Sequence, residues 1–318
     1  MANTTLIFSD SGGYKTTNLG FAARWIYGRT KKKVRLVTAE QYRPIQPLID
    51  IGIIDVVDLR TSANPLVSLR KLSYGWWMTE TGKLGPAVSE TWLMDNISCY
   101  LVEGLTSISD MLMEDARDKQ RQIGQAPVGK FTEEDEKFCN NPLDHYGFVQ
   151  REVLARVRSF ATLPVEMVLF SSHEARGEES DSRAAIRGPG LAGTAATDKV
   201  GKEVGNLIHF EIYSELTEDT NQQTRKKTTR VIPSVKAFFV PHPDPKVPGV
   251  TYKCKVRLPS DRIPELMKRF PGGYFEPTLT GGLDRFLQAE DELLASTTDD
   301  LAKWKNEVDS KQTTAATT

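Results

Sequence analysis

The sequence lacks the features that mark secreted, cysteine-rich or membrane proteins. Its three cysteines, Cys99, Cys139 and Cys254, lie far apart and form no CxxC pair. This spacing argues against a zinc site and a disulfide framework, and it suits a reducing cytoplasm. No apolar run approaches the roughly 18 residues that suggest a membrane span, and no charged segment resembling a signal peptide precedes the first apolar run. We therefore expect a cytoplasmic protein with no membrane partner.

The sequence also has almost no net charge. Its 41 Lys and Arg residues nearly balance 42 Asp and Glu residues, which leaves a formal charge of −1. This balance argues against a globally basic nucleic-acid-binding protein, so any such contact needs a local patch. With 318 residues, of which 39% are hydrophobic, the chain fits one large α/β domain, with or without appendages.

The sequence begins with a strand, loop, helix and strand. Thr4–Phe8 is a buried strand pattern, Ser9–Thr17 is a loop of small residues, and a helical pattern runs from Thr16 to about Gly28. A second strand, Val34–Thr38, follows. A βαβ unit of this kind implies a parallel sheet.

The rest of the chain alternates similar elements. We expect further strands at the end of Pro47–Leu59 and at Ile97–Val102, Val165–Phe170, Leu207–Tyr213, Val235–Val240 and Tyr252–Leu258. Helices are expected at Ile108–Ala116, Gly147–Phe160 and Phe286–Leu294.

This order predicts an α/β fold with a mostly parallel central sheet flanked by helices, plus a C-terminal β-hairpin. We expect one domain over residues 1–290, with a polar insertion around 117–142 and a mobile loop at 175–205. Residues 291–318 form a polar tail, expected to be disordered at its end.

The first loop is a variant of the phosphate-binding P-loop, or Walker A motif. The pattern is G-x-x-x-x-G-K-[ST], and residues 9–16 read SDSGGYKT, so Lys15 and Thr16 match while Ser9 and Tyr14 replace the two glycines. The strand before the loop and the helix after it favour phosphate binding, because a helix N-terminus offers free N–H groups. Lys15 is predicted to contact the β- and γ-phosphates of ATP, and Thr16 to hold Mg²⁺. The predicted nucleotide-binding residues are Ser11, Gly12, Gly13, Tyr14, Lys15, Thr16 and Thr17. The alternative is a glycine-rich turn with a solvated lysine.

Tyr14 stands where the motif normally has glycine. We expect it to adopt helical dihedrals, because Gly12 and Gly13 can absorb the unusual dihedrals at low steric cost. Its ring should then lie outside the loop.

Acidic residues follow three predicted strands. Glu40, Glu103 and Glu174 stand at strand ends, where open α/β sheets bind ligands. Glu103 occupies the Walker B position and is predicted to hold Mg²⁺, and Glu40 could orient the attacking water. Asp95 is a rival to Glu103, because residues 92–95 (WLMD) also resemble a strand with a terminal acid. Each carboxylate could instead be an ordinary solvated group.

Ser172 and His173 follow the predicted strand Val165–Phe170. A polar side chain there could sense the γ-phosphate, so His173 joins Glu103 and Glu40 as a candidate catalytic residue. A capped strand end is the alternative interpretation.

Two basic groups are candidates for other contacts. Arg183, Arg187 and Lys199 in the expected mobile loop could contact DNA, although that loop has no aromatic residue to stack on bases. Lys253, Lys255 and Arg257 alternate and would share one face of a strand. That face could insert into a neighbour's nucleotide site or be a solvated edge.

Four segments resemble the phage-encoded RecA-like P-loop ATPases, AAA-type nucleotide-binding proteins related to single-strand annealing proteins. They are SGGYKTTNL with KKVRLVTAE, YLVEGLTSISD, VLFSSHEAR followed by RGPGLAGTA, and KCKVRLP with RFPGGYF. The resemblance spans about residues 5–276 and implies a RecA-type core, ATP and Mg²⁺, and a role in phage DNA recombination, replication or repair in the host cytoplasm. It also implies assembly into a homo-oligomeric ring or filament, with a basic residue supplied by a neighbour.

Three functions stay open on the sequence. The first is an ATPase that acts in DNA transactions, possibly on single-stranded DNA. The second is a nucleotide-binding scaffold or virion-associated protein with little turnover, which the altered glycines favour. The third, a small-molecule kinase, is weak because no basic lid motif stands out.

Overall fold

The computed structural model describes residues 2–77, 85, 87–125, 142–176, 187–192, 194–220, 227–278 and 281–315. The strands are β1 (Asn3–Ser9), β2 (Lys33–Thr38), β3 (Ile54–Asp58), β4 (Ile97–Glu103), β5 (Met167–Arg176), β6 (Arg187–Pro189), β7 (Asn206–Thr220), β8 (Lys227–Phe238), β9 (His242–Pro243), β10 (Thr251–Tyr252) and β11 (Tyr274–Phe275). The helices are α1 (Lys15–Thr30), α2 (Gln46–Asp50), α3 (Pro65–Leu72), α4 (Glu90–Asn96), α5 (Leu105–Gln125), α7 (Pro142–Ala161), α8 (Thr194–Glu203), α9 (Ile263–Arg269) and α10 (Leu283–Ala315), with short 3₁₀ turns η1 (Arg43–Ile45) and η2 (Leu59–Thr61).

The described strands form one large, mostly parallel sheet in the order β11-β8-β7-β1-β5-β4-β2-β3. Every neighbouring pair from β7 to β3 is parallel, while β7–β8 and β8–β11 are antiparallel. Strand β5 lies between β1, which leads into the phosphate loop, and β4, which ends at Glu103. The carboxyl ends of these strands therefore meet at one edge of the sheet. The predicted α/β class is confirmed.

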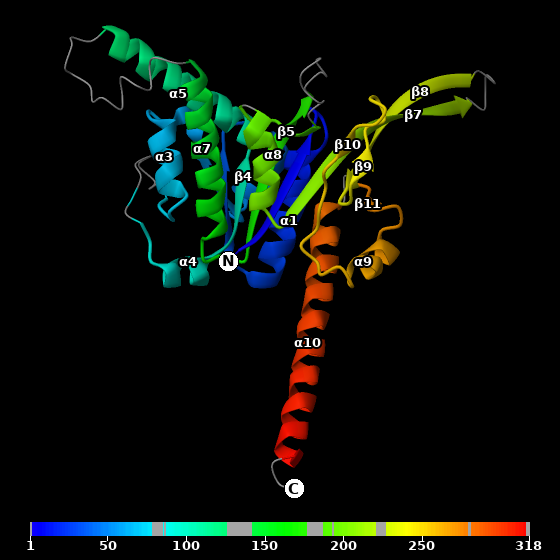
Figure 1. The fold of residues 1–318 in the computed structure, drawn as a ribbon. Helices are drawn as coiled ribbons and strands as arrows, with labels where there is room; N and C mark the ends of the chain where they lie inside the picture. The colour runs from blue at the N-terminus through cyan, green and yellow to red at the C-terminus, as the bar shows by residue number, and fades with distance from the viewer. Residues whose placement is uncertain are drawn as a thin grey trace.

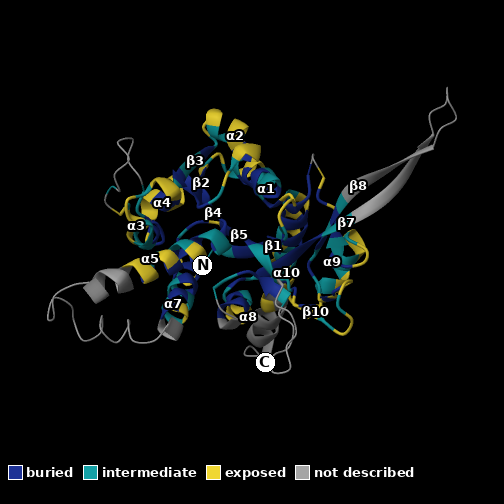
Figure 2. Ribbon diagram, turned by 90° about the horizontal axis from the view of Figure 1, so that it is seen from above, coloured by how far each residue is buried: buried dark blue, intermediate teal, exposed yellow. Residues whose placement is uncertain are grey.

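Helices cover both faces of the sheet (Figure 1). One core contains side chains of α3, α5, α7 and α8, and the other contains side chains of α1, α9 and α10. Because both faces are covered, β4 is buried along its whole length, which explains its continuous apolar run. Figure 2 shows the central strands buried and the outward sides of the helices exposed.

Two elements extend away from the sheet. The β7–β8 hairpin continues past the body as a two-stranded ribbon, and α10 projects in a different direction (Figure 1). The start of α10 is anchored by the buried side chains of Leu283, Phe286 and Leu287. The helix continues through residue 290, so the expected boundary there and the start of the tail are wrong. Helical periodicity in the polar sequence accounts for the difference, and residues 316–318 lie outside the described residues.

Several other expectations about local structure are wrong. Residues 117–125 belong to α5, and the expected loop at 175–205 includes β6 and α8, whose Ala196 and Val200 are buried. The expected strand Tyr252–Leu258 is limited to β10 and one bridge at Lys255. The remainder of both expected loops, 126–141 and 177–186, lies outside the described residues. No described helix is long and apolar enough to cross a membrane.

Candidate nucleotide and magnesium site

The phosphate loop closes between β1 and α1 around the ammonium group of Lys15. Its Nζ lies 3.1 Å from the Ser9 carbonyl oxygen, 3.2 Å from Ser9 Oγ and 3.0 Å from the Asp10 carbonyl oxygen. Lys15 is buried, and this burial lowers the pKa of its ammonium group, while the carboxylates of Glu40 and Glu103 act in the opposite direction. A desolvated cation at a helix N-terminus is well suited to bind an anion.

Tyr14 does not adopt the helical dihedrals that we expected. It precedes α1 with φ 55° and ψ 23°, in the left-handed region, so the prediction that the glycines absorb the unusual dihedrals is wrong. The residue that replaces the motif's second glycine thus keeps a conformation that favours glycine. Its side chain is 38% exposed, as expected for a ring outside the loop.

Gly13 is required for a different reason. A Cβ atom at Gly13 would lie 2.1 Å from Ser9 Oγ, so the absence of a side chain lets the loop pass over the end of β1. Asn18 then fixes the helix start, because its Nδ2 donates to the Tyr14 carbonyl at 3.0 Å and its Oδ1 accepts from the Leu283 N–H at 3.1 Å. The loop is therefore tied to the beginning of α10.

Thr16 and Glu103 meet across the sheet edge. The Thr16 hydroxyl donates to Oε1 of Glu103, while the buried Oε2 of Glu103 has no hydrogen-bond partner among the described residues. Burial is the main cause that raises the pKa of Glu103 to about 7, and the nearby Glu40 carboxylate adds to it. An unpartnered carboxylate oxygen beside a threonine hydroxyl fits the oxygen donors that Mg²⁺ prefers.

Glu40 lies next to this pair, at the end of β2. Its Oε1 accepts from Ser107 Oγ at 2.9 Å and lies 3.2 Å from Nε2 of His173. Burial opposes ionisation, but the hydrogen bonds from His173 and Ser107 outweigh it and lower the pKa of Glu40. Glu103 and Glu40 therefore have pKa values shifted in opposite directions, which separates a group that titrates near neutrality from one that stays ionised.

Gly104 makes room for this arrangement. It has φ 80°, and a Cβ atom there would lie 2.6 Å from Glu40 Cγ. Its N–H donates to Ser171 Oγ at 3.1 Å. Sequence reasoning missed Gly104, Ser107 and Ser171, although the segment 103–107 (EGLTS) offered a signal in its glycine directly after a strand-end acid.

The other sequence candidates lie elsewhere. Asp95 belongs to α4, at the amino end of β4, so its interpretation as a strand-end rival to Glu103 is wrong. Glu174 hydrogen-bonds Tyr252 and His209 away from Glu103. The Ser172 hydroxyl is buried within β5 and has no partner among the described residues, so only His173 joins Glu40.

The residues proposed for contacts with DNA do not form one surface in the described structure. Arg183 lies outside the described residues. The Arg187 guanidinium is ion-paired with Asp244 and its side chain is 8% exposed, which leaves little of it for a DNA contact. Lys199 is exposed on α8 rather than on a loop.

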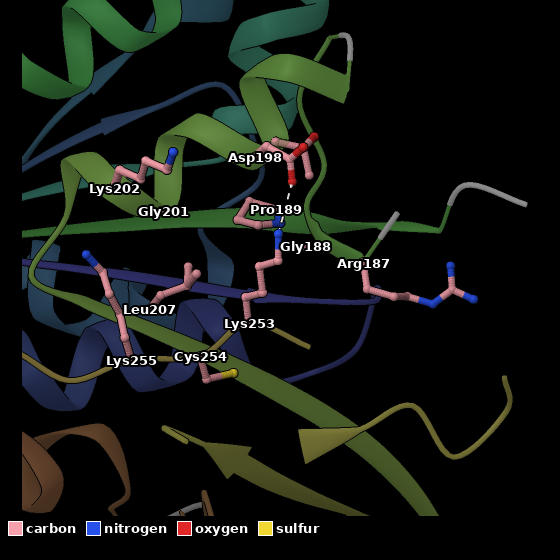
Figure 3. A pocket seen from close by; sticks show the side chains of 11 residues that line it. Arg187, Gly188, Pro189, Asp198, Gly201, Lys202, Leu207, Lys253, Cys254 and Lys255 are labelled. Carbon is pink, nitrogen blue, oxygen red and sulfur yellow. Dashed lines mark ion pairs between the residues drawn. The ribbon is translucent and has the colours of Figure 1, made fainter. Parts of the chain in front are cut away.

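The expected basic face of Lys253, Lys255 and Arg257 is divided. Lys253 and Lys255 line a cavity of about 210 Å³ with Lys202 (Figure 3), and Lys253 pairs with Asp198 at 3.7 Å. Arg257 instead pairs with Glu290 and Asp291 of α10, so it does not share that face.

Comparison with known proteins gives little beyond this geometry. No protein-family model and no curated protein matches the sequence. Among solved structures, the chain is similar to a KaiC-like protein from the hyperthermophilic archaeon Pyrococcus horikoshii. That match has 14% identity and a TM-score of 0.34, and covers 74% of this chain and 84% of the other. We base no argument on a similarity this low, and the assignment of the site rests on its residues.

Proposed function

We propose that the chain binds ATP with Mg²⁺ and hydrolyses it. The observation that carries this proposal is the convergence of Lys15, the Thr16–Glu103 pair and Glu40 at one edge of a parallel sheet. Lys15 would contact the β- and γ-phosphates, while Thr16 and the free Oε2 of Glu103 would hold Mg²⁺. Glu40, kept ionised by His173 and Ser107, would orient the attacking water.

The resemblance to phage RecA-like ATPases supports a more specific role. We infer that hydrolysis serves phage DNA recombination, replication or repair, with single-stranded DNA as a partner. The same resemblance supports a homo-oligomeric ring or filament. Lys253 and Lys255, rather than Arg257, are then the candidates for the basic residues that reach a neighbour's nucleotide.

One observation favours the second candidate, a nucleotide-binding scaffold. Tyr14 is in a left-handed conformation that costs a residue with a Cβ atom roughly 1–2 kcal/mol. A loop held in this way could bind nucleotide and still position it poorly for turnover.

The deciding experiment measures Mg²⁺–ATP binding by calorimetry and phosphate release with and without single-stranded oligonucleotides. Turnover that the oligonucleotide stimulates would support the DNA-linked ATPase. Saturable binding without phosphate release would support the scaffold, and no binding would reject both.

The raised pKa of Glu103 predicts that Mg²⁺ binding depends on pH. With a pKa of about 7, the ionised fraction rises from about a tenth at about pH 6 to about nine-tenths at about pH 8. Because only the carboxylate holds the ion well, we expect Mg²⁺ affinity in the presence of ATP to increase about tenfold over this range. Calorimetric titrations at both pH values measure this change, and Glu103→Gln should remove it. An equal dependence in the variant would assign the titration to another group.

The conformation of Tyr14 predicts opposite effects of two small replacements. Tyr14→Gly should be more stable than Tyr14→Ala by about 1 kcal/mol in urea unfolding, because glycine adopts the left-handed conformation without the Cβ penalty. ATP affinity should change by less than about tenfold in Tyr14→Gly, since the side chain lies outside the loop. Equal stability of the two variants would contradict the assigned backbone conformation, and a much larger gain in affinity would favour the scaffold.

A further inference from the structure

A second cluster of ionisable side chains lies on β7 and β9, apart from the nucleotide site. His209 and Glu211 are two residues apart on β7, so they share a face of that strand, and His242 begins β9. All three are buried, and one ligand atom from each lies within 4.8 Å of the others. Specifically, His209 Nδ1 lies 2.9 Å from His242 Nε2, and that nitrogen lies 3.5 Å from Glu211 Oε2.

The outer nitrogens of both rings face acceptors. His209 Nε2 lies 3.2 Å from the Glu174 carboxylate, and His242 Nδ1 lies 3.4 Å from the Val240 carbonyl oxygen. When these outer nitrogens carry the protons, the inner nitrogens of both neutral imidazoles present lone pairs to each other. Glu211 Oε2, buried and without a hydrogen-bond partner among the described residues, adds another acceptor. Three acceptors then converge with no proton between them, which is unfavourable unless a cation lies among them.

The surroundings keep both rings neutral and fixed. Burial is the largest cause that lowers the pKa of His209. The His209 ring stacks on Tyr252, with centroids 3.9 Å apart, and His242 stacks on Phe238 at the same centroid distance. A histidine that coordinates a metal typically donates its other ring N–H to a carboxylate or a backbone carbonyl, as these two can.

We propose that His209 Nδ1, His242 Nε2 and Glu211 Oε2 bind a Zn²⁺ ion. Two imidazole nitrogens and one carboxylate oxygen are a donor set suited to zinc, whereas Mg²⁺ and Ca²⁺ prefer oxygen ligands throughout. Zn–N bonds of about 2.0–2.1 Å place two nitrogens of a tetrahedral site roughly 3.3 Å apart, close to the spacing found here. The absence of paired cysteines argued against a zinc site only for cysteine ligands, and the sequence signal for this one, H-x-E at 209–211, was missed.

The ion would link segments that are far apart in the chain. It would fasten β9, and with it the β9–β10 hairpin, to the parallel strand β7. Glu174, which orients His209, also hydrogen-bonds Tyr252 of β10. The site is therefore structural in character and independent of the proposed ATPase activity.

The test uses the full chain, stripped with a chelator and then titrated with Zn²⁺ against a chromophoric competitor. We expect one Zn²⁺ per chain, a higher melting temperature with Zn²⁺ but not with Mg²⁺, and visible d–d absorption bands when Co²⁺ replaces Zn²⁺. Glu211→Gln and His242→Asn should each weaken Zn²⁺ binding at least about 100-fold. His173→Gln is the matched control, because it removes a partly exposed histidine beside Glu40 and should leave Zn²⁺ affinity unchanged.

Glu174→Gln keeps the test decisive if a ligand variant fails to fold. This change leaves all three ligands in place and should weaken Zn²⁺ binding about 10–100-fold through loss of the carboxylate that orients His209. Wild-type affinity in both Glu174→Gln and Glu211→Gln would overturn the proposal. So would a stripped wild-type chain that takes up no Zn²⁺, or a loss of binding in His173→Gln, which would place the ion at Glu40 instead.

Discussion

Lys15→Ala is expected to weaken Mg²⁺–ATP binding about 100-fold while the protein stays folded. The ammonium group is buried at the start of α1 and donates to loop oxygens rather than packing into the core. Hydrogen bonds to charged groups contribute about 1.5–3 kcal/mol each, so losing the contacts to two phosphates corresponds to this change. Stability should change little, because burial already disfavours the charge. Calorimetry measures the affinity, and urea unfolding measures the stability.

Lys268→Ala is the control for this variant. It removes the same charge from an exposed position on α9, and it should bind ATP like the wild type. ATP affinity that is unchanged in Lys15→Ala would end the phosphate-loop interpretation, whatever its fold. An equal loss in both variants would indicate a general charge effect.

The sequence contains enough information to predict the main parts of the nucleotide site. Lys15 and Thr16 are placed by a local motif, since a strand, a short loop and a helix fix their position. Glu103, Glu40 and His173 come from different strands, but parallel neighbours bring their carboxyl ends to one edge. The rule needs only the correct assignment of each strand, which the buried apolar runs supply.

Short segments are less predictable, because they are too brief to reveal a period. Residues 92–95 resemble a strand, but Ser89 caps a helix there by accepting from the Trp92 N–H. Helix α8 was hidden by its glycine and alanine content, although Ala196, Val200 and Val204 recur at intervals of four residues. Those positions were a usable signal for a buried helical face.

Contacts that depend on pairing between distant strands could not be derived at all. The cluster of His209, Glu211 and His242 requires the register of β7 against β8 and the path of the chain from β8 to β9. The left-handed Tyr14 is a second example. Motif reasoning assumed that a glycine would take the strained dihedrals, whereas the fixed ends of β1 and α1 impose them on the residue that occupies the position.

Glu103→Gln is expected to slow ATP hydrolysis at least about 100-fold while ATP affinity changes less than about tenfold. Glutamine keeps the shape of the side chain and can still accept from Thr16, but it removes the charge of the buried oxygen that is free to hold Mg²⁺. Loss of one electrostatic group that acts on the transition state commonly costs a hundredfold or more in rate. Phosphate release under saturating ATP measures the rate, and a binding titration measures the affinity.

Asp95→Asn is the matched control, because it neutralises a carboxylate at the other end of the same strand. Asp95 is exposed on α4, and the length of β4 places it about 20 Å from Glu103. Its replacement should leave hydrolysis unchanged. If Asp95→Asn stopped turnover and Glu103→Gln did not, Mg²⁺ would be held elsewhere. If both variants hydrolysed ATP at the wild-type rate, Glu40 would become the first carboxylate to replace, since it lies beside Glu103 and its depressed pKa keeps it charged.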